Sequence, residues 1–246
     1  LAQDRGIPVI EDCAQAHGAH YKGRMAGALG DISAFSTMSG KHHATGPQGG
    51  VVFTRDEDLG WEAKRFSDRG KPFNSDADSN TRAGLNLNGN DLSAAIGRVQ
   101  LQKIGAMIEK RRHLAAQIEV AIADLKAVRL GRRVPETEGI YWFMRFHVDA
   151  DKLTVDKEIF AAAVAAEGIP LTASYRFIPS HCKWFKERRV FPGSDYPWGL
   201  PAYKGDRDAE FPCPNAIAAV ESHFIMSIHE NWGAQEVADV AEALAK

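Results

Sequence analysis

The chain has 246 residues, of which 44% are hydrophobic and 25% are charged, and its formal net charge is −2. These proportions are those of average globular proteins, so they exclude collagen-like, coiled-coil and largely disordered chains. A near-neutral protein has no excess of cations with which to displace counterions from a nucleic acid. We therefore expect a folded protein that has no nucleic-acid partner.

Charge or glycine interrupts every apolar run within a few positions, whereas a membrane-spanning helix needs about 18 or more consecutive apolar residues. We therefore expect no membrane partner. The cysteines are Cys13, Cys182 and Cys213, and this odd, widely spaced set fits neither a disulfide framework nor paired metal ligands. We expect reduced thiols and a cytoplasmic protein. The chain begins at Leu1 with no start methionine and no signal-peptide pattern, so we expect a natural N-terminus further upstream.

Short apolar runs flanked by glycine, aspartate or proline predict the first three strands. They cover residues 7–10, 32–36 and 51–54. Such runs are typical of strands that are buried on both faces of a sheet covered by helices. We therefore predict an α/β domain over residues 1–104, and because three strands make a small sheet we expect part of that sheet to lie upstream.

Helical spacing begins near Asp91, where apolar residues such as Leu92 and Val99 recur on one side. Asn90 or Asp91 is suited to cap the start of this helix. The periodicity continues to about residue 125, and the charges at residues 109–112 predict a solvated face.

Residues 105–246 predict a smaller α+β domain. The pattern indicates a strand over residues 141–148, an alanine-rich helix over 157–167 and a terminal helix over 235–245. Residues 177–211 are rich in proline, glycine and aromatics and show no period, which predicts an ordered loop.

Asp12 directly follows the first predicted strand. Ligands of open α/β sheets bind outside the carboxyl ends of the strands, so this carboxylate can face a bound cofactor. The alternative is that Asp12 only caps a following helix.

Lys41 lies among glycines and hydroxyl residues after the second predicted strand. Glycines let a backbone approach a ligand closely, hydroxyl and main-chain N–H groups bind phosphate, and a desolvated lysine can form a Schiff base with an aldehyde. These are the parts of a pyridoxal-phosphate site. A glycine-rich turn with a solvated lysine is the alternative, and the order of glycine, lysine and hydroxyl is not that of a P-loop.

Four histidines, His17, His20, His42 and His43, occur in the same region. No carboxylate or cysteine joins them at a recognised zinc spacing, and adjacent rings such as those of His42 and His43 do not easily reach one metal. We therefore expect no metal site.

Ordered motifs run through nearly the whole chain. In chain order they are VIEDCAQAHGA at residues 9–19, GALGD at 27–31, Phe35-Ser36, Lys41, QGG at 48–50, GLNL at 84–87, DLSAAIG at 91–97, Gln100-Leu101, Arg111-Arg112 and Cys213-Pro214. Together they resemble the DegT/DnrJ/EryC1/StrS family of sugar aminotransferases. The resemblance implies a pyridoxal-phosphate-dependent homodimer of fold type I, an α/β fold with a partial large-domain sheet and a small C-terminal α+β domain.

The resemblance also implies roles for five residues. Asp12 would pair with the pyridine nitrogen of the cofactor, and Gln15 would lie against the cofactor ring and its phenolic oxygen. Ser36 would contact the phosphate, and Lys41 would form the Schiff base and then carry the proton between substrate and cofactor. Asn86 would reach the phosphate from the other subunit.

The alignment of the chain with the family is ambiguous by one residue around Lys41. Counting forward from Ser36 places the family's lysine at Lys41, whereas counting backward from residues 49–50 places it at His42. We follow the forward count because a turn rich in glycine and proline accommodates one inserted residue easily. Relatives with histidine at this position resemble sugar dehydratases that use the pyridoxamine form of the cofactor, so a dehydratase using His42 is the alternative.

The function implied by the resemblance is transfer of an amino group from glutamate or glutamine to a nucleotide-linked keto-sugar. The family's first part, with a phosphate-binding loop and an aromatic that stacks on the pyridine ring, has no counterpart here. We therefore expect this chain alone to bind the cofactor weakly or not at all, and a non-catalytic interaction module is a third hypothesis. The sequence specifies neither the sugar, its aminated carbon nor the nucleotide.

Overall fold

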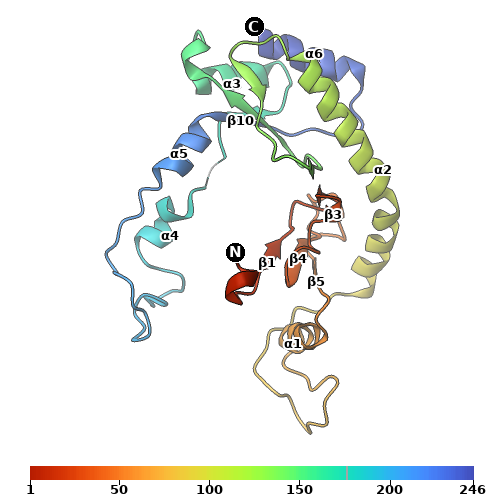
Figure 1. Ribbon diagram of the computed structural model, residues 1–246, viewed down its shortest axis with the longest axis vertical. Coiled ribbons are helices and arrows are strands. Elements are labelled where there is room, and N and C mark those ends of the chain that lie inside the picture. Colours follow the sequence, from red (N-terminus) through yellow and green to blue (C-terminus); the bar gives the residue numbers. More distant parts are fainter. Residues whose placement is uncertain (176) are drawn as a thin grey trace. The chain divides into compact units, whose positions relative to one another are not determined.

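The structure is a computed structural model that describes residues 1–175 and 177–246 (Figure 1). The chain forms two compact units. Unit 1 comprises Leu1–Ile118, Arg133–Trp142 and Ile228–Val237, and unit 2 comprises Glu119–Arg132, Phe143–Ser227 and Ala238–Lys246. The domain boundary expected at residue 104 falls inside helix α2 (Asp91–Ala121), and the division of the protein into domains at that point stays a prediction.

The central sheet of unit 1 has the strand order β1-β4-β5, with β1 at Ile10–Asp12, β4 at Ile32–Ser36 and β5 at Gly50–Thr54. Strand β1 pairs parallel to β4, and Asp12 lies opposite Ala34. Strand β5 pairs antiparallel to β4. Because β1 and β4 are parallel, their carboxyl ends meet at one edge of the sheet.

The expectation that these strands are buried on both faces is wrong for this chain. In β1, Ile10 is 76% exposed, and in β5, Val52 is 56% exposed. Within β4, by contrast, Ser33 is 1% exposed. An apolar sequence makes a strand suitable for burial, but the strand is buried only where other elements cover the sheet. The first strand also begins at Ile10 instead of residue 7.

A second small sheet of unit 1 has the order β3-β2-β7. Its strands are β2 (His20–Tyr21), β3 (Arg24–Met25) and β7 (Thr137–Glu138), all paired antiparallel. In this sheet His20 lies opposite Glu138. The pairing joins two segments that are far apart in sequence and brings residues 139–142 next to the N-terminal part of the unit.

Two helices accompany these sheets. Helix α1 (Glu57–Ser67) is capped by Asp56, whose side chain accepts a hydrogen bond from the backbone N–H of Leu59. Helix α2 begins at Asp91 as predicted, but Leu92 at its start is 80% exposed, so the apolar side is not buried there. Its buried residues are Gly97, Ile108, Arg111, Leu114, Ala115 and Ile118. In the described part of the chain, no helix is both long and apolar enough to cross a membrane.

Unit 2 contains an antiparallel sheet of order β6-β8-β10-β9. The strands are β6 (Val128–Leu130), β8 (Met144–Val148), β9 (Leu171–Thr172) and β10 (His223–Met226). The α-helices from residue 157 onward are α3 (Lys157–Ala166), α4 (Lys183–Lys186), α5 (Pro214–Glu221) and α6 (Ala234–Ala245), and the short 3-10 turns of the chain are Gln3–Arg5, Ala150–Lys152 and Pro179–His181. The predicted strand, alanine-rich helix and terminal helix correspond to β8, α3 and α6.

The core of unit 2 lies on the central strands of this sheet. Phe146 of β8 lies opposite Phe224 of β10, and both rings are 0% exposed. The ring of Phe160 from α3 stacks on Phe224 at a centroid distance of 5.5 Å. The helix is therefore held to the sheet by aromatic packing as well as by burial of aliphatic side chains.

We expect Phe224→Ala to lower the free energy of unfolding by about 3 to 5 kcal/mol, because it removes a fully buried ring and leaves a cavity. Urea unfolding followed by circular dichroism measures the change. Ile159→Ala is the matched control, since Ile159 lies on α3 but is 56% exposed, and it should change stability by less than about 0.5 kcal/mol. Equal losses in both variants would contradict this assignment of the core.

Candidate functional site

The parallel strands of unit 1 place Asp12 and Ser36 at the same edge of the sheet. Asp12 is the last residue of β1, and Ser36 is the last residue of β4. The backbone N–H of Cys13 donates to Ala34 O at 2.8 Å, so the pairing continues past Asp12. Asp12 itself is exposed, and its Oδ1 accepts the N–H of Ala14 at 3.0 Å. The hypothesis that Asp12 caps a helix is wrong, because turns follow β1.

The loop after Ser36 closes on itself through backbone and hydroxyl bonds. The N–H of Thr37 donates to Gly49 O at 2.9 Å, and the N–H of Thr45 donates to Thr37 O at 2.9 Å. The hydroxyls of these two threonines lie 2.7 Å apart. A Cβ on Gly49 would collide with both hydroxyls, so glycine is required for this closure. The closed loop presents Lys41 beyond the carboxyl end of β4.

Lys41 is half-buried and lies against an aromatic ring. Its Nζ is 4.4 Å from the ring centroid of Trp142. The indole Nε1 of Trp142 donates to Gly40 O at 2.9 Å. Trp142 was not among the residues singled out from sequence, because nothing in the local pattern shows that position 142 contacts position 41.

The neighbouring His42 is in a different environment. Its ring is 5% exposed, and neither ring nitrogen has a hydrogen-bond partner among the residues that the structure describes. Burial, together with the charge of Arg111, lowers the pKa of His42 to about 4. His42 is therefore neutral near pH 7, and its side chain lies inside the unit while that of Lys41 is accessible.

A buried ion pair lies close to His42. Arg111 of α2 is 8% exposed, and its Nε and Nη2 are 3.0 and 2.9 Å from Glu230 Oε2. Burial would raise the pKa of Glu230, but hydrogen bonding and Arg111 leave it below its usual value. The predicted solvated face is thus wrong at Arg111. The sequence did contain a signal for the burial of Arg111, because Arg111 falls at helical spacing with the buried Ile108 and Ala115.

Arg111 and the adjacent Arg112 hold backbone carbonyls from two other segments. Arg111 Nη1 donates to Tyr141 O at 2.9 Å. Arg112 Nε donates to Gly139 O at 2.9 Å, and its Nη2 donates to Gly18 O at 3.1 Å. Gly18 has φ +80°, and a Cβ there would lie 2.6 Å from the side chain of Ile108. Helix α2 therefore fixes both the turn after Asp12 and the segment that carries Trp142.

The other two predicted cofactor contacts, Gln15 and Asn86, lie in different parts of unit 1. Gln15 is half-buried in the turn after β1, close in sequence to Asp12. Asn86 pairs through its backbone with Asp68, and its Oδ1 accepts from Asn88. Hydrogen bonds from Asn88, Arg69 and Lys71 hold the pKa of Asp68 well below its usual value. None of the described contacts of Asn86 reaches Asp12, Ser36 or Lys41 within this chain.

The donor set at this edge fits pyridoxal phosphate. An exposed carboxylate, a hydroxyl at a strand end and an accessible lysine lie on consecutive parts of one sheet edge and loop. The cofactor needs an anionic partner for its pyridine nitrogen, donors for its phosphate and an amine for its aldehyde. Within residues 1–175 and 177–246, no group of three or more histidine, cysteine or acidic side chains is arranged to hold a metal ion.

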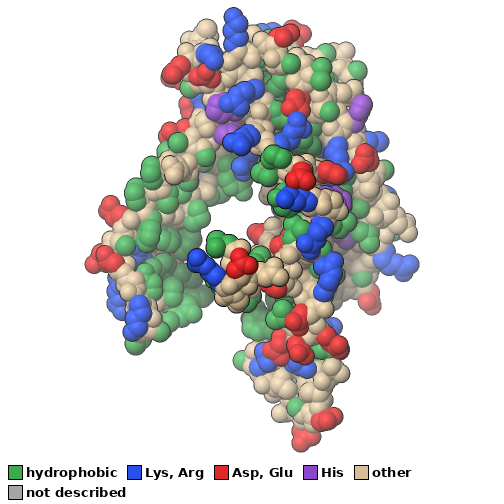
Figure 2. All heavy atoms as spheres, viewed as in Figure 1, with side chains coloured by type: hydrophobic (Ala, Val, Ile, Leu, Met, Phe, Trp, Pro, Cys, Tyr) green, Lys and Arg blue, Asp and Glu red, His purple; other side chains and the backbone are tan. Residues whose placement is uncertain are grey.

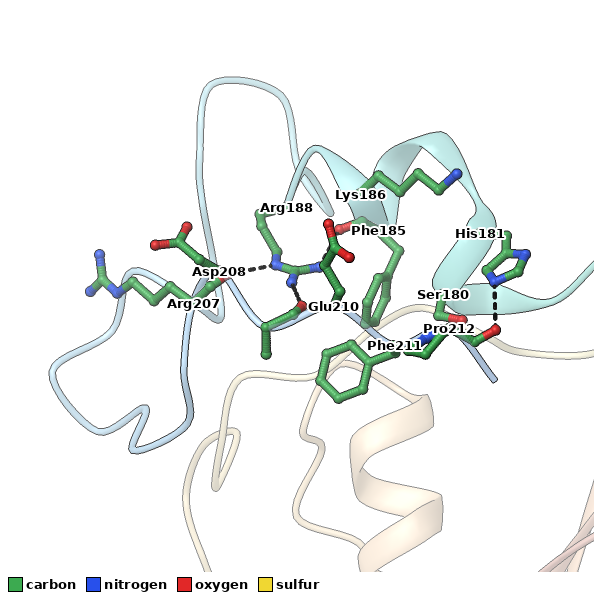
Figure 3. Close-up of a pocket in the computed structure, with 11 residues that line it drawn as sticks. Ser180, His181, Phe185, Lys186, Arg188, Arg207, Asp208, Glu210, Phe211 and Pro212 are labelled. Atoms are coloured by element: carbon green, nitrogen blue, oxygen red, sulfur yellow. Dashed lines mark hydrogen bonds between the residues drawn. The ribbon is translucent and has the colours of Figure 1, made fainter. Parts of the chain in front are cut away.

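Unit 2 has a hollow of about 510 Å³ (Figure 3). Its lining residues lie between Ser180 and Pro212, almost all of them in the predicted loop of residues 177–211. Figure 3 shows the guanidinium of Arg188 directed at the opposite chain segment, where it donates to Arg207 O at 2.9 Å and to Ala209 O at 2.6 Å. Its carbon lies 4.9 Å from the ring centroid of Phe185. Arg188 thus holds the loop together. Hydrophobic side chains gather over the segment with α4 and α5 in Figure 2. In the predicted loop region, Phe177 is 68% exposed.

Solved structures show the class of protein to which this fold corresponds. An aminotransferase from Psychrobacter cryohalolentis superposes with a TM-score of 0.80 at 24% identity, covering 99% of this chain and 62% of that one. A Streptomyces venezuelae DesV structure, in complex with a ketimine intermediate, gives 0.78 at 23% identity over 99% and 58% of the chains. The fold is that of these aminotransferases, which confirms the predicted α/β fold type I class.

The chain belongs to the DegT/DnrJ/EryC1/StrS aminotransferase family, which it matches over residues 1–245, and the predicted resemblance is therefore confirmed. The family is one of pyridoxal-phosphate-dependent enzymes. A dTDP-4-dehydro-2,3,6-trideoxy-D-glucose 4-aminotransferase of Saccharopolyspora spinosa is 27% identical over 100% of this chain and 60% of its own length. GDP-perosamine synthase of Escherichia coli O157:H7 is 32% identical over 65% and 46%. The chain spans less than two thirds of these relatives.

The burial of His42 gives the stability of the protein a pH dependence. Above pH 6.5 the ring is neutral in both the folded and the unfolded state. Between pH 6.5 and about 4 the unfolded chain takes up a proton at this ring and the folded chain does not, so the free energy of unfolding falls. A pKa lowered from 6.5 to about 4 corresponds to at most about 3.4 kcal/mol, and partial screening by solvent reduces this to about 2 kcal/mol.

We expect His42→Leu to remove about 2 kcal/mol of the stability loss between about pH 7 and about pH 4. Urea unfolding at a series of pH values measures it. Part of the pH dependence should remain, because burial also lowers the pKa of His17. His113→Gln, on the exposed side of α2, is the control and should keep the wild-type pH profile. The same profile in His42→Leu as in wild type would show that His42 is not buried as described.

Proposed function

We propose that the chain provides the lysine-bearing part of a pyridoxal-phosphate site in an enzyme that transfers an amino group from glutamate or glutamine to a nucleotide-linked keto-sugar. The observation that carries the proposal is the arrangement of Asp12, Ser36 and Lys41 along one sheet edge and its following loop. Family membership supports the reaction class.

Each residue of this edge has a defined task. Pyridoxal phosphate, when bound, supplies an electron sink for the substrate carbon. Asp12 would hold the protonated pyridine nitrogen, and Ser36 would donate its hydroxyl to the phosphate; each is the last residue of its strand. Lys41 would supply the amine for the cofactor aldehyde and would hold and move the proton at the substrate carbon. Gln15 lies against the ring in this proposal, next to Asp12 in the same turn.

The proposal includes a homodimer in the cytoplasm. Asn86 of one copy binds the phosphate of the other, which agrees with its position at Asp68, where no described contact joins it to Lys41 of its own chain. The nucleotide-linked substrate is supported by the relatives, whose names specify dTDP-linked and GDP-linked sugars. The free thiols of all three cysteines support a reducing compartment.

The environments of Lys41 and His42 favour the aminotransferase over the dehydratase. A residue that acts on a bound cofactor has to reach it, and Lys41 is accessible whereas His42 is 5% exposed. The lowered pKa of His42, about 4, also makes it a poor proton donor near neutral pH. Both observations support the forward register, with the lysine at position 41.

We expect pyridoxal phosphate to label Lys41 in preference to the other lysines of the chain. The protein is incubated with a graded excess of cofactor, reduced with borohydride and digested, and the adducts are quantified by mass spectrometry. Excess cofactor is needed because we expect weak binding by this chain. We expect the preference because Asp12 and Ser36, which would bind the ring and the phosphate, lie at the sheet edge from which the loop with Lys41 begins.

Asp12→Asn and Ser36→Ala should each lower the share of adduct at Lys41 by about tenfold, since each removes a charge-assisted or hydrogen-bonding contact. Asp4→Asn is the control for loss of one exposed carboxylate outside the site. Adducts that stay evenly spread over the exposed lysines of the wild type at every excess of cofactor would overturn the proposal for this chain and favour the non-catalytic module. A cofactor that binds without reaching any lysine would instead favour the dehydratase.

A further inference from the structure

We propose that Trp142 is a positioning residue for Lys41, in which the indole face holds the ammonium group and the indole N–H holds the preceding peptide. The inference rests on the function proposed for Lys41. It adds a residue outside the motifs on which the resemblance depends, from a segment 101 positions further along the chain. All of the residues involved belong to unit 1.

Two contacts of one side chain act on two successive residues. Nε1 of Trp142 donates to Gly40 O at 2.9 Å, which fixes the backbone immediately before Lys41. The Lys41 Nζ lies 4.4 Å from the centroid of the same ring, within the range of an attractive cation–π contact. Both ends of the lysine are therefore restrained, its peptide by a hydrogen bond and its charged tip by the ring face. A lysine side chain otherwise retains many rotamers.

The segment that carries Trp142 is itself anchored. Its neighbour Tyr141 offers a backbone carbonyl to Arg111, and Gly139 offers one to Arg112. The guanidinium of Arg111 is buried and paired with Glu230, so it cannot easily leave its place. Residues 137–138 are also paired with the strand that contains His20. The indole therefore has a fixed position before any ligand binds, as preorganisation of a reactive group requires.

The contact also has a chemical consequence. The ring face attracts the ammonium, so the amine has to leave Trp142 before it reacts with a carbonyl. The indole thus holds Lys41 at a defined starting point and reduces its reaction with chance electrophiles. A leucine at position 142 fills part of the same space and offers no π face, whereas phenylalanine keeps the face but not the N–H.

The test measures the reactivity of Lys41 in the protein without cofactor. Wild type, Trp142→Leu and Trp142→Phe are treated with a trace of N-hydroxysuccinimidyl acetate at fixed pH, and acetylation of each lysine is quantified by mass spectrometry relative to Lys64. We expect Trp142→Leu to raise the rate at Lys41 about threefold and Trp142→Phe to leave it within about 1.5-fold of wild type. Trp61→Ala, which removes an indole bonded to Glu57, is the control and should leave Lys41 unchanged.

Equal rates at Lys41 in wild type and Trp142→Leu would overturn the proposal. Equal increases in the leucine and phenylalanine variants would also overturn it, because the ring face would then contribute nothing beyond the N–H bond to Gly40. If Trp142→Leu unfolds, acetylation rises at every lysine, Lys64 included. In that case the acetylation rate of Lys41 in Trp142→Phe, relative to that of Lys64, decides between the outcomes. The cofactor adduct is measured in the same variants. We expect the share at Lys41 to fall severalfold in Trp142→Leu, because the amine is no longer held at one place.

The two readouts separate the two proposals. If the function proposed for Lys41 is wrong, wild type gives no preferred adduct at Lys41, but acetylation still responds to the loss of the indole face. If only the role of Trp142 is wrong, the preferred adduct at Lys41 remains in wild type and in both variants, and acetylation does not change.

Discussion

The parallel pairing of β1 with β4 is the constraint on which the candidate site depends. Parallel strands end at the same edge, so the side chains that follow them meet there without any further adjustment. This pairing places Asp12 and Ser36 at the same edge although they are 24 positions apart in sequence, and the N–H of Cys13 extends the pairing beyond the strand. The loop closed by Thr37 and Gly49 then starts from a fixed point and carries Lys41.

Helix α2 supplies the second constraint through two adjacent arginines. Arg111 and Arg112 bind carbonyls on the segment before Trp142, and Arg112 also binds the turn at Gly18. A guanidinium is suited to this because its fork of donors can serve several acceptors at once. The backbone around the site is therefore held by side chains of a helix that contributes no residue to the cofactor edge.

The sequence predicted much of the skeleton of the site. Residues 32–36 form β4 with the predicted bounds, and α2 begins at the predicted residue, because local apolar patterns and capping residues carry these features. Helix α1 was not predicted, although Asp56 is a suitable N-cap. The position of Asp12 after a strand was also evident from the pattern.

The contacts around Lys41 were harder to predict. The contact between Lys41 and Trp142 depends on the path of the chain between them, and no local pattern encodes a pairing over such a distance. Arg111 is a different case, because its helical spacing with Ile108 and Ala115 places it on the buried stripe. A charged residue on such a stripe predicts a buried partner, here Glu230, but its identity requires the fold. Exposure of β1 and β5 depends on what covers the sheet, which a strand's own residues do not specify.

A crystal structure of the protein with pyridoxal phosphate tests the assignment of the site most directly. We expect continuous electron density from Lys41 Nζ to the cofactor, with the Asp12 carboxylate at the pyridine nitrogen and the Ser36 hydroxyl at the phosphate. Density for the cofactor that is not joined to Lys41, or a cofactor bound away from the edge formed by β1 and β4, would contradict it.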